Sequence, residues 1–450
     1  MPPPAVPGSG AVTLDLVAAE RPTALPCFRG AKLPLWTLSD TAWPPVVRLK
    51  LGERLDATFT NNLPGESEHS SIHWHGIRLP NDQDGVPYLT QRPVWPGETF
   101  GYSFVPPDTG TFFFHPHCDT AAQLGRGMAG VLIVEGDATE PYDADVPILL
   151  RDWQIDEAGS FLPFFTPEGA GKAGTFGTVR SANGEENPEI ILPAMGDCRL
   201  RLLNLDNTRV MEVGVEGAEA AIVAIDGIAV SPLPLKSWRL GPAMRLDIVV
   251  RAPADGASAR IVDYFAPEPV PLARLIGTGD ARRTTAFDPL PLRSGRIPEP
   301  DLQNAERMTF AFSATATAEA IAEAKTQGLL IDSLCSSAGT FWAINKQVWP
   351  AGDHSRIPAP LATLQRGRSY VFELQNLTPH QHPIHIHGHS FKFLRSNKRN
   401  LPVHHADTVL LQPKERVEVA LVADNPGDWM LHCHIIEHQE SGMMGYIRVA

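Results

Sequence analysis

Hydrophobic and polar residues alternate with a period of two in many short runs of this chain. Clear examples are residues 46–61, VVRLKLGERLDATFTN, and residues 199–205, RLRLLNL. Successive side chains of an extended strand point to opposite faces, so this period predicts β-strands rather than helices. The 42 prolines and 37 glycines are spread through the sequence and separate the runs, as turn residues do. The pattern therefore predicts a mostly β protein.

An internal repeat organises these runs. Residues 96–117, PGETFGYSFVPPDTGTFFFHPH, align without gaps on residues 413–434, PKERVEVALVADNPGDWMLHCH, and a third copy begins at Pro242. A period of roughly 150 residues is the size of a whole β-domain rather than of a short structural repeat. We therefore expect three related β-domains. Their expected ranges are 1–140, 141–290 and 291–450, with Pro-rich, charged linkers at 135–145 and 288–303.

Histidines gather in four short boxes in the first and third repeats. The boxes are His73 with His75, His115 with His117, His382 with His385 and His387, and His432 with His434, continuing to His438. On a strand, the two histidines of an H-x-H pair share one face. The four pairs can then converge as eight imidazoles where the first and third domains meet. Val213, Val215, Ile261 and Asp263 stand at the matching places of the middle repeat, so the middle domain is expected to be a spacer without metal ligands.

Cys433 lies between two of these histidines, so on a strand it points to the opposite face. A lone H-C-H tripeptide could be a buried free cysteine between two ordinary histidines. Together with His382, His438 and the thioether of Met443, however, Cys433 forms the ligand set of a blue-copper electron-transfer centre. Eight imidazoles suit three further ions, and imidazole alone favours copper or zinc. The neighbouring thiolate site favours copper, because redox-silent zinc would gain nothing from a one-electron neighbour.

All four boxes, in this order, make the whole chain similar to the three-domain multicopper oxidases of the bacterial laccase type. The resemblance implies an all-β fold of three cupredoxin-like Greek-key β-sandwiches, and four copper ions. It implies a type 1 copper on His382, Cys433, His438 and Met443, a type 2 copper on His73 and His385, and a type 3 pair held by His75, His115 and His434 and by His117, His387 and His432.

The resemblance also implies a mechanism. A reducing substrate gives one electron at a time to the type 1 copper, Cys433 conducts it, and the trinuclear cluster reduces dioxygen to two waters. Asp84, in NDQDGVPYLTQRP, matches the proton-supplying acid of the family, although an isolated Asp-Gly is a common turn. The chain departs from the family in one place, because Gln439 follows His438 where many relatives have an acid. Glu440 is then the candidate for a second proton donor.

These features predict a laccase-like oxidase of phenols or aromatic amines. A metal-ion oxidase acting on Cu(I), Fe(II) or Mn(II) is the alternative. The nine methionines are scattered, and residues 314–330 predict a short helix without sulfur, unlike the methionine-rich insertion of many Cu(I) oxidases. A non-catalytic scaffold or copper store would be expected to lack ligands, and a copper nitrite reductase would lack the full type 3 set.

Composition limits the partners. A net charge of −13 argues against nucleic acid and against an anionic membrane surface, and no apolar run approaches membrane-spanning length. We expect a monomer. The start of the chain, MPPPAVPGSGAVTLDL, shows no signal peptide, and the resemblance implies a periplasmic or secreted protein. The remaining cysteines could form up to two disulfides in three possible pairings, or stay free thiols; they are Cys27, Cys118, Cys198 and Cys335.

Overall fold

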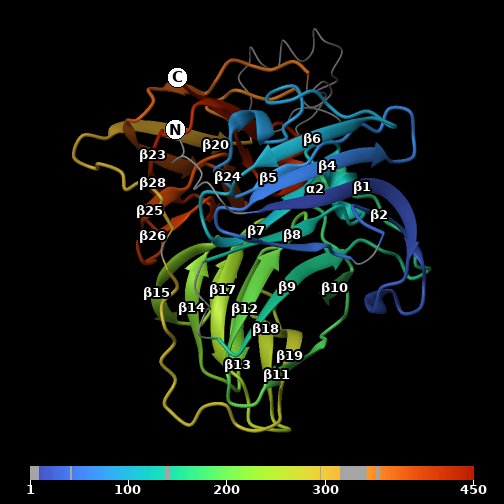
Figure 1. The fold of residues 1–450 in the computed structure, drawn as a ribbon. Helices are drawn as coiled ribbons and strands as arrows, with labels where there is room; N and C mark the ends of the chain where they lie inside the picture. The colour runs from blue at the N-terminus through green and yellow to red at the C-terminus, as the bar shows by residue number, and fades with distance from the viewer. Residues whose placement is uncertain (1–9, 41–42, 137–141, 294, 315–341, 351–354) are drawn as a thin grey trace.

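The chain folds into three β-sandwiches. The computed structural model describes residues 10–40, 43–136, 142–293, 295–314, 342–350 and 355–450. In Figure 1 the first sandwich (blue to cyan) and the third (orange to red) form the upper half of the molecule, and the second (green to yellow) lies below both. The expected all-β fold is thus confirmed, whereas the predicted helix at 314–330 lies almost wholly outside the described residues.

The first sandwich has two four-stranded sheets. In spatial order, one sheet contains β2 (Leu33–Thr37), β1 (Ala11–Thr23), β4 (Arg54–Asn62) and β6 (Thr99–Phe104), and the other contains β3 (Val46–Lys50), β8 (Gly130–Glu135), β7 (Gly110–His115) and β5 (His73–His75). The alternating run 46–61 forms β3 and most of β4. Its alternate apolar side chains face the core, whereas Val46 at the start of β3 is exposed; the buried ones are Val47, Leu49, Leu55, Ala57 and Phe59.

The second sandwich packs a six-stranded sheet on a five-stranded one. The larger sheet contains β10 (Val179–Ala182), β9 (Ala144–Trp153), β12 (Asp197–Asn204), β17 (Arg245–Arg251), β14 (Ala220–Ile225) and β15 (Ile228–Pro234). The smaller one contains β11 (Glu189–Pro193), β19 (Val270–Thr278), β18 (Ser258–Asp263), β13 (Met211–Glu216) and β16 (Trp238–Leu240).

The third sandwich repeats this arrangement. Its larger sheet contains β21 (Ala343–Ile344), β20 (Glu306–Ser313), β23 (Ser369–Asn376), β28 (Arg416–Val422), β25 (Phe391–Ser396) and β26 (His404–Ala406). Its smaller sheet contains β22 (Ala362–Leu364), β30 (Met444–Val449), β29 (Gly427–Cys433), β24 (His382–Ile386) and β27 (Thr408–Leu411). The strands of the three sandwiches span residues 11–135, 144–278 and 306–449, and the exact domain boundaries stay a prediction.

The internal repeat has a structural meaning. Its copies form the strand pairs β6–β7, β17–β18 and β28–β29, and in each pair the second strand belongs to the opposite sheet from the first. Each copy is therefore the crossing from one sheet of a sandwich to the other.

Short helices and loops complete the fold. The helices are η1 (Pro26–Phe28), η2 (Asn81–Gln83), α1 (Thr120–Gly125), α2 (Pro167–Ala170) and α4 (Ile436–Glu440). None of the helices in the described ranges has the length and apolar character needed to cross a bilayer. Cys27, Cys118, Cys198 and Cys433 carry free thiols, so no disulfide joins the cysteines that the structure describes, and Cys335 lies outside them.

The repeat glycines differ in their surroundings, which gives a test of the packing. Gly427 has φ +134°, and a Cβ there would meet the Asn81 side chain of the first domain at 2.4 Å. Gly256 has φ +71° and nothing within 4 Å of such a Cβ. We expect Gly427→Ala to lower the free energy of unfolding by about 2–5 kcal/mol, because backbone strain and overpacking add. Gly256→Ala should cost only about 1–2 kcal/mol. Calorimetry measures the unfolding temperature of both variants, and an equal decrease in the two would contradict this packing.

Candidate metal centre

The first domain presents its histidines on one outer face. Strand β5 pairs antiparallel with β7, and His73 stands opposite His115. Trp74, between His73 and His75, is fully buried and packs on Tyr102 in the core of the sandwich. Because neighbouring side chains alternate, the two histidines point out of the opposite face of the sheet.

The third domain separates its ligands in the same way. In the β24–β29 pair, His385 stands opposite His432 and Ile384 stands opposite Cys433. Ile384 is fully buried in the core, so Cys433 lies on the core side and His432 on the outer side, as the alternation predicts. His434, beyond the end of the strand, returns to the outer side, where its ring centroid is 5.2 Å from that of His115.

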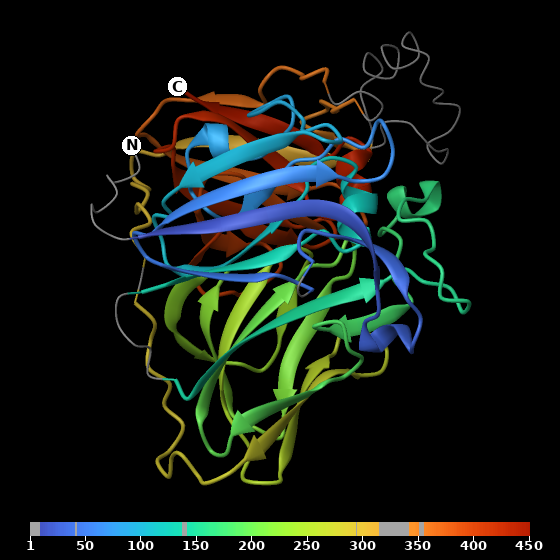
Figure 2. The ribbon, with the colours of Figure 1, turned by 45° about the vertical axis from the view of Figure 1, so that its right-hand side comes forward.

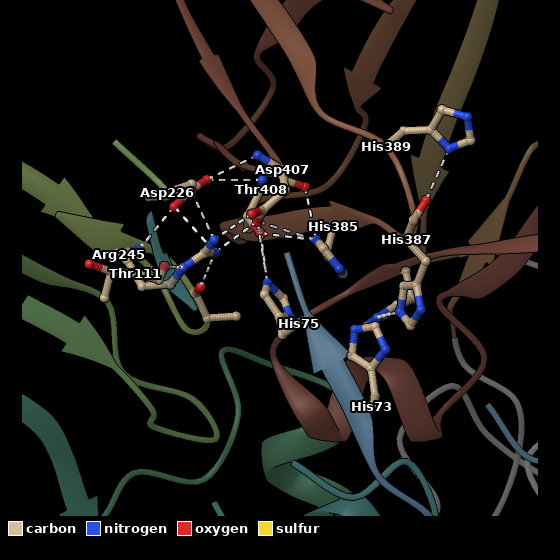
Figure 3. A network of polar contacts seen from close by, with 12 residues as sticks. His73, His75, Thr111, Asp226, Arg245, His385, His387, His389, Asp407 and Thr408 are labelled. Atoms are coloured by element: carbon tan, nitrogen blue, oxygen red, sulfur yellow. Dashed lines mark hydrogen bonds and ion pairs between the residues drawn. The ribbon is translucent and has the colours of Figure 1, made fainter. Parts of the chain in front are cut away.

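Eight imidazoles converge on the contact between these two faces. Their nitrogens form overlapping sets in which the potential ligand atoms lie within 4.8 Å of one another: His73, His75 and His115; His73, His385 and His387; and His117, His387 and His432. His434 completes the eight, with its ring 5.1 Å from that of His75. We call this group the imidazole cluster. Figure 3 shows four of its members, His73, His75, His385 and His387.

The hydrogen bonds of these rings leave one side of the cluster unsatisfied. The Nδ1 atoms of His73, His115 and His385 contact backbone carbonyls at 2.8, 2.9 and 2.9 Å. Their buried Nε2 atoms have no hydrogen-bond partner in the described structure, and the same is true of both nitrogens of His434. A buried polar atom without a partner is costly. Nitrogen lone pairs that share one space in this way fit metal ions.

Burial also sets the charge of the cluster. Desolvation, followed by the proximity of the other imidazoles, lowers the pKa of most of its members well below the usual value for histidine; these are His75, His115, His117, His387, His432 and His434. These six rings are therefore neutral at pH 7, and neutral imidazole is the form that binds a metal.

A second group contains sulfur. The Cys433 Sγ lies 3.6 Å from His382 Nδ1 and 3.7 Å from His438 Nδ1, and the two Nδ1 atoms are 3.1 Å apart. Their Nε2 atoms bond the Thr378 hydroxyl at 2.7 Å and the Lys172 carbonyl at 2.8 Å. Both Nδ1 atoms thus remain for a metal. Burial raises the pKa of the Cys433 thiol, so a bound metal must displace its proton. We call these three residues the sulfur cluster.

Met443 lies beside the sulfur cluster. Its N–H donates to the His438 carbonyl at 2.9 Å, and its carbonyl accepts from the Cys433 N–H at 3.0 Å. The Met443 side chain is fully buried. The backbone therefore holds the predicted axial residue next to both of these ligands.

Asp84 reaches the imidazole cluster from the first domain. Its Oδ2 accepts from His387 Nδ1 at 2.9 Å, and its Oδ1 lies 3.3 Å from His73 Nδ1. Gly85 has φ +82°, and a Cβ there would lie 1.8 Å from the Ile72 carbonyl oxygen. Only glycine fits this position, so the Asp-Gly turn and the placement of the carboxylate are one structural feature.

The two residues after His438 lie in different surroundings. The Glu440 carboxylate accepts from the Ala121 N–H at 2.8 Å, and burial, with the nearby Asp119, raises the pKa of Glu440 to about 8. Gln439 lines a cavity of about 20 Å³ together with His117, and this volume is enough for one water molecule.

A segment of the second domain covers the sulfur cluster. Besides the Lys172 carbonyl on His438, the Ala170 carbonyl accepts from Trp342 Nε1 at 2.7 Å. The Glu437 carboxylate accepts from the Thr166 N–H at 2.7 Å. We call residues 164–176 the covering segment; Figure 2 shows it, in green with α2, rising from the second domain along the side of the upper half. As a result His438 is fully buried.

Several supporting residues were missed by the sequence interpretation. Thr378 fixes His382, Lys172 fixes His438 through its backbone, and Asp407 lies 3.3 Å from His75 Nε2. Asp407 in turn pairs with Arg245 of the middle domain. The only available signal was the polar Asp-Thr pair inside the strand-like run after His404. Of the histidines outside the boxes, His69, His380, His389, His404 and His405 join no potential metal group among the described residues, and His354 lies outside them.

Comparisons with known proteins agree with this geometry. Three family models, each described as multicopper oxidase, match residues 25–139, 145–262 and 336–450. A multicopper oxidase structure from Pseudomonas thermotolerans is 38% identical, covers 98% of this chain and 100% of its own, and superimposes with a TM-score of 0.85. The chain belongs to the multicopper oxidase family. It is therefore an oxidoreductase with copper cofactors that acts on a reducing substrate with dioxygen.

Two relatives of this oxidase illustrate the names that similar proteins carry. "Multicopper oxidase MmcO" of Mycobacterium tuberculosis is 28% identical over 90% of this chain and 81% of its own length. A protein named laccase, from Cryphonectria parasitica, is 26% identical over 89% of this chain and 75% of its own length.

The support that Thr378 gives to His382 can be tested. In Thr378→Val the His382 Nε2 loses its partner, so the ring is free to turn and its Nδ1 is less well oriented. We expect copper affinity at the sulfur cluster to fall about 10–100-fold, the usual effect of losing a group that orients a ligand. Competition with a chelator, followed by the thiolate-to-copper absorption, measures it. Thr37→Val removes a buried hydroxyl that bonds Arg21, far from the cluster in sequence, and should leave this affinity unchanged.

Proposed function

We propose that this multicopper oxidase is a laccase-like enzyme that oxidises phenols or aromatic amines by one electron at a time and reduces dioxygen to two waters. One observation carries the proposal. The sulfur cluster and the imidazole cluster are separate, yet they are joined through the backbone of the tripeptide His432-Cys433-His434. One-electron oxidation coupled to four-electron reduction requires one group that faces the donor and one that faces dioxygen, connected by covalent bonds.

The unpartnered nitrogens support four copper ions. We assign the type 1 ion to His382, Cys433, His438 and Met443, the type 2 ion to His73 and His385, and the type 3 pair to His75, His115 and His434 and to His117, His387 and His432. When bound, these ions take up electrons singly from the donor and supply four of them to dioxygen. The chain contributes the neutral nitrogens, the thiolate and the exclusion of water, since none of the ten histidine ligands is more than 6% exposed.

Protons must reach the same place as the electrons. Asp84 is the proposed proton donor at the imidazole cluster, because its carboxylate is buried and already bonds His387. Glu440 is the proposed second acid, and one of its carboxyl oxygens accepts from the Ala121 N–H at 2.8 Å. Gln439, which cannot ionise, lines the cavity beside His117. We infer that Asp84 carries most of the proton supply.

The remaining proposals concern the donor and the setting. All proposed ligands come from one chain, which supports a monomer, and we place the protein in the periplasm or outside the cell. Sedimentation and cell fractionation test these two points. Oxygen uptake by the copper-loaded protein with a phenol, with Cu(I) and with Fe(II) tests the donor class. Higher turnover with a metal ion than with any phenol would replace the laccase-like function by a metal-ion oxidase.

Removing the thiolate should separate the two clusters. We expect Cys433→Ser to lose the intense blue absorption and one of about four coppers per chain, because a serine hydroxyl is not the soft ligand of a blue-copper site. Oxygen uptake with a phenol should disappear. Absorption spectra and copper analysis measure both effects, and a variant that stayed blue would rule out Cys433 as a ligand.

Asp84→Asn keeps the size and hydrogen bonding of the side chain but removes its ionisable group. Bleaching of the blue band by a phenol without oxygen should proceed at nearly the parent rate, since Asp84 does not touch the sulfur cluster. Reoxidation of the reduced protein by dioxygen should slow about 100-fold or more, the usual scale for losing a positioned proton donor. Stopped-flow absorption measures both rates.

Two further variants sharpen this experiment. Asp82 lies in the same turn but is exposed, so Asp82→Asn should reoxidise at the parent rate. Adding Gln439→Glu to Asp84→Asn should restore part of the lost rate. A parent-like reoxidation rate in Asp84→Asn would exclude it as the main proton donor.

A further inference from the structure

The middle domain carries no histidine ligand, yet it places one buried arginine at the meeting point of all three domains. The Nε of Arg245 donates to the Thr111 carbonyl of the first domain at 3.1 Å. Its Nη2 donates to the Asp226 carbonyl of the second at 2.9 Å, and its Nη1 donates to Asp407 Oδ1 of the third at 2.8 Å. Figure 3 shows the guanidinium among these groups.

The guanidinium is fully satisfied. Nη1 also donates to the Ala243 carbonyl at 3.1 Å, and Nη2 also donates to Asp407 Oδ2. Five N–H groups thus meet five acceptors, and two of these acceptors are the two oxygens of one carboxylate. Such a bidentate contact fixes the plane of the Asp407 carboxylate and stabilises its negative charge. Arg245 and Asp407 have almost no exposure, so water cannot take the place of either partner.

Asp407 in turn contacts two imidazoles from different domains. Its Oδ1 lies 3.3 Å from His75 Nε2 of the first domain, and its carbonyl contacts His385 Nδ1 of the third at 2.9 Å. The Thr408 hydroxyl, which donates to Asp407 Oδ1 at 2.8 Å, lies 3.4 Å from the same His75 nitrogen and 3.2 Å from the same His385 nitrogen. The two rings stack with centroids 3.7 Å apart.

These contacts decide which nitrogen of each ring is left for a metal. His75 is held through Nε2, and its buried Nδ1 has no partner; His385 is held through Nδ1, and its buried Nε2 has none. Asp226 holds the backbone in register, since its Oδ2 accepts from the N–H of Thr408 at 3.0 Å. Asp407 thus contacts two neighbouring ligands from two domains. Its Oδ1 lies 3.3 Å from His75 Nε2 and 3.5 Å from His385 Nδ1, its backbone carbonyl also contacts His385 Nδ1, and Arg245 holds its carboxylate in place.

We propose that Arg245 of the middle domain is a positioning residue for the imidazole cluster, which sets the ring orientations of His75 and His385 through Asp407. Without the guanidinium, Asp407 would be a buried carboxylate that has lost its cation, and it would turn toward other donors. His75 would then lose the carboxylate oxygen beside its Nε2, and His385 would keep the backbone carbonyl but lose the Asp407 Oδ1 that lies 3.5 Å from its Nδ1. The proposal rests on copper binding at the imidazole cluster but not on the identity of the electron donor.

The test is Arg245→Met, read by copper content and electron paramagnetic resonance. We expect the copper held by His385 and His73 to bind about 10–100-fold more weakly, the scale for losing a group that orients a ligand. Its resonance signal should broaden or disappear on mild chelation. The blue absorption of the sulfur cluster should remain. This split between two copper sites is not expected from a general loss of stability.

Arg201→Met is the matched control. Arg201 is also a buried arginine of the second domain, it bonds the Thr111 hydroxyl at 2.8 Å, and it pairs with Asp145 within its own domain. It is expected to lower the unfolding temperature but to keep both copper signals. Equal retention of the His385 copper in Arg245→Met and Arg201→Met would overturn the proposal.

Two more variants cover a failure of Arg245→Met to fold. Arg245→Lys keeps the positive charge but not the bidentate contact with Asp407, so it should show the same selective copper loss in a milder form. Thr408→Val leaves the Arg245–Asp407 pair intact and removes only the hydroxyl near both rings, and it should weaken the same copper. A parent-like His385 copper signal in both variants would also overturn the proposal. If the parent protein itself bound no copper at the imidazole cluster, the assignment under "Proposed function" would fail first.

Discussion

Burial of ten imidazoles and one thiol where water cannot reach them is the constraint on which this structure depends. Most of these rings bond a supporting group through one nitrogen, and the other nitrogen of several rings has no partner in the described structure. Burial lowers the pKa of most of these rings and raises the pKa of the Cys433 thiol, which favours the neutral form of each group. Three sandwiches must then meet closely enough to exclude water, which explains why the supporting contacts cross domain boundaries so often.

Much of this could be predicted from the sequence, because the signals were local. The period of two predicted β3, β4 and the opposite faces of His432 and Cys433, and the repeat predicted related sandwiches. The same period was less informative for Arg201, which alternates with leucines as an exposed residue would. Arg201 is buried, because the first domain covers that face of β12 and supplies Thr111 as a partner.

The residues that orient the ligands could not be found in this way. Asp407 and Thr408 act through the pairing of β27 with β24, where Thr408 stands opposite His385, and a pattern within one strand does not reveal its distant partner. Lys172 contributes only a carbonyl oxygen, which every residue has. The middle domain has no histidine box, yet through Arg245 and the covering segment it contacts supports of both clusters. The lack of histidine ligands in the sequence of the middle domain therefore did not predict that this domain supports both clusters.

The covering segment has a consequence for the choice of donor. His438 bonds a peptide carbonyl instead of facing solvent, so a reducing molecule that docks on this side meets residues 164–176 and not the ring itself. If the sulfur cluster is the donor-facing site that we propose, an electron from such a molecule has to cross this segment before it reaches His438. On this proposal the same few residues set how near a donor comes to His438 and shield that ring from the medium, and a change to their outer side chains would alter the first without the second.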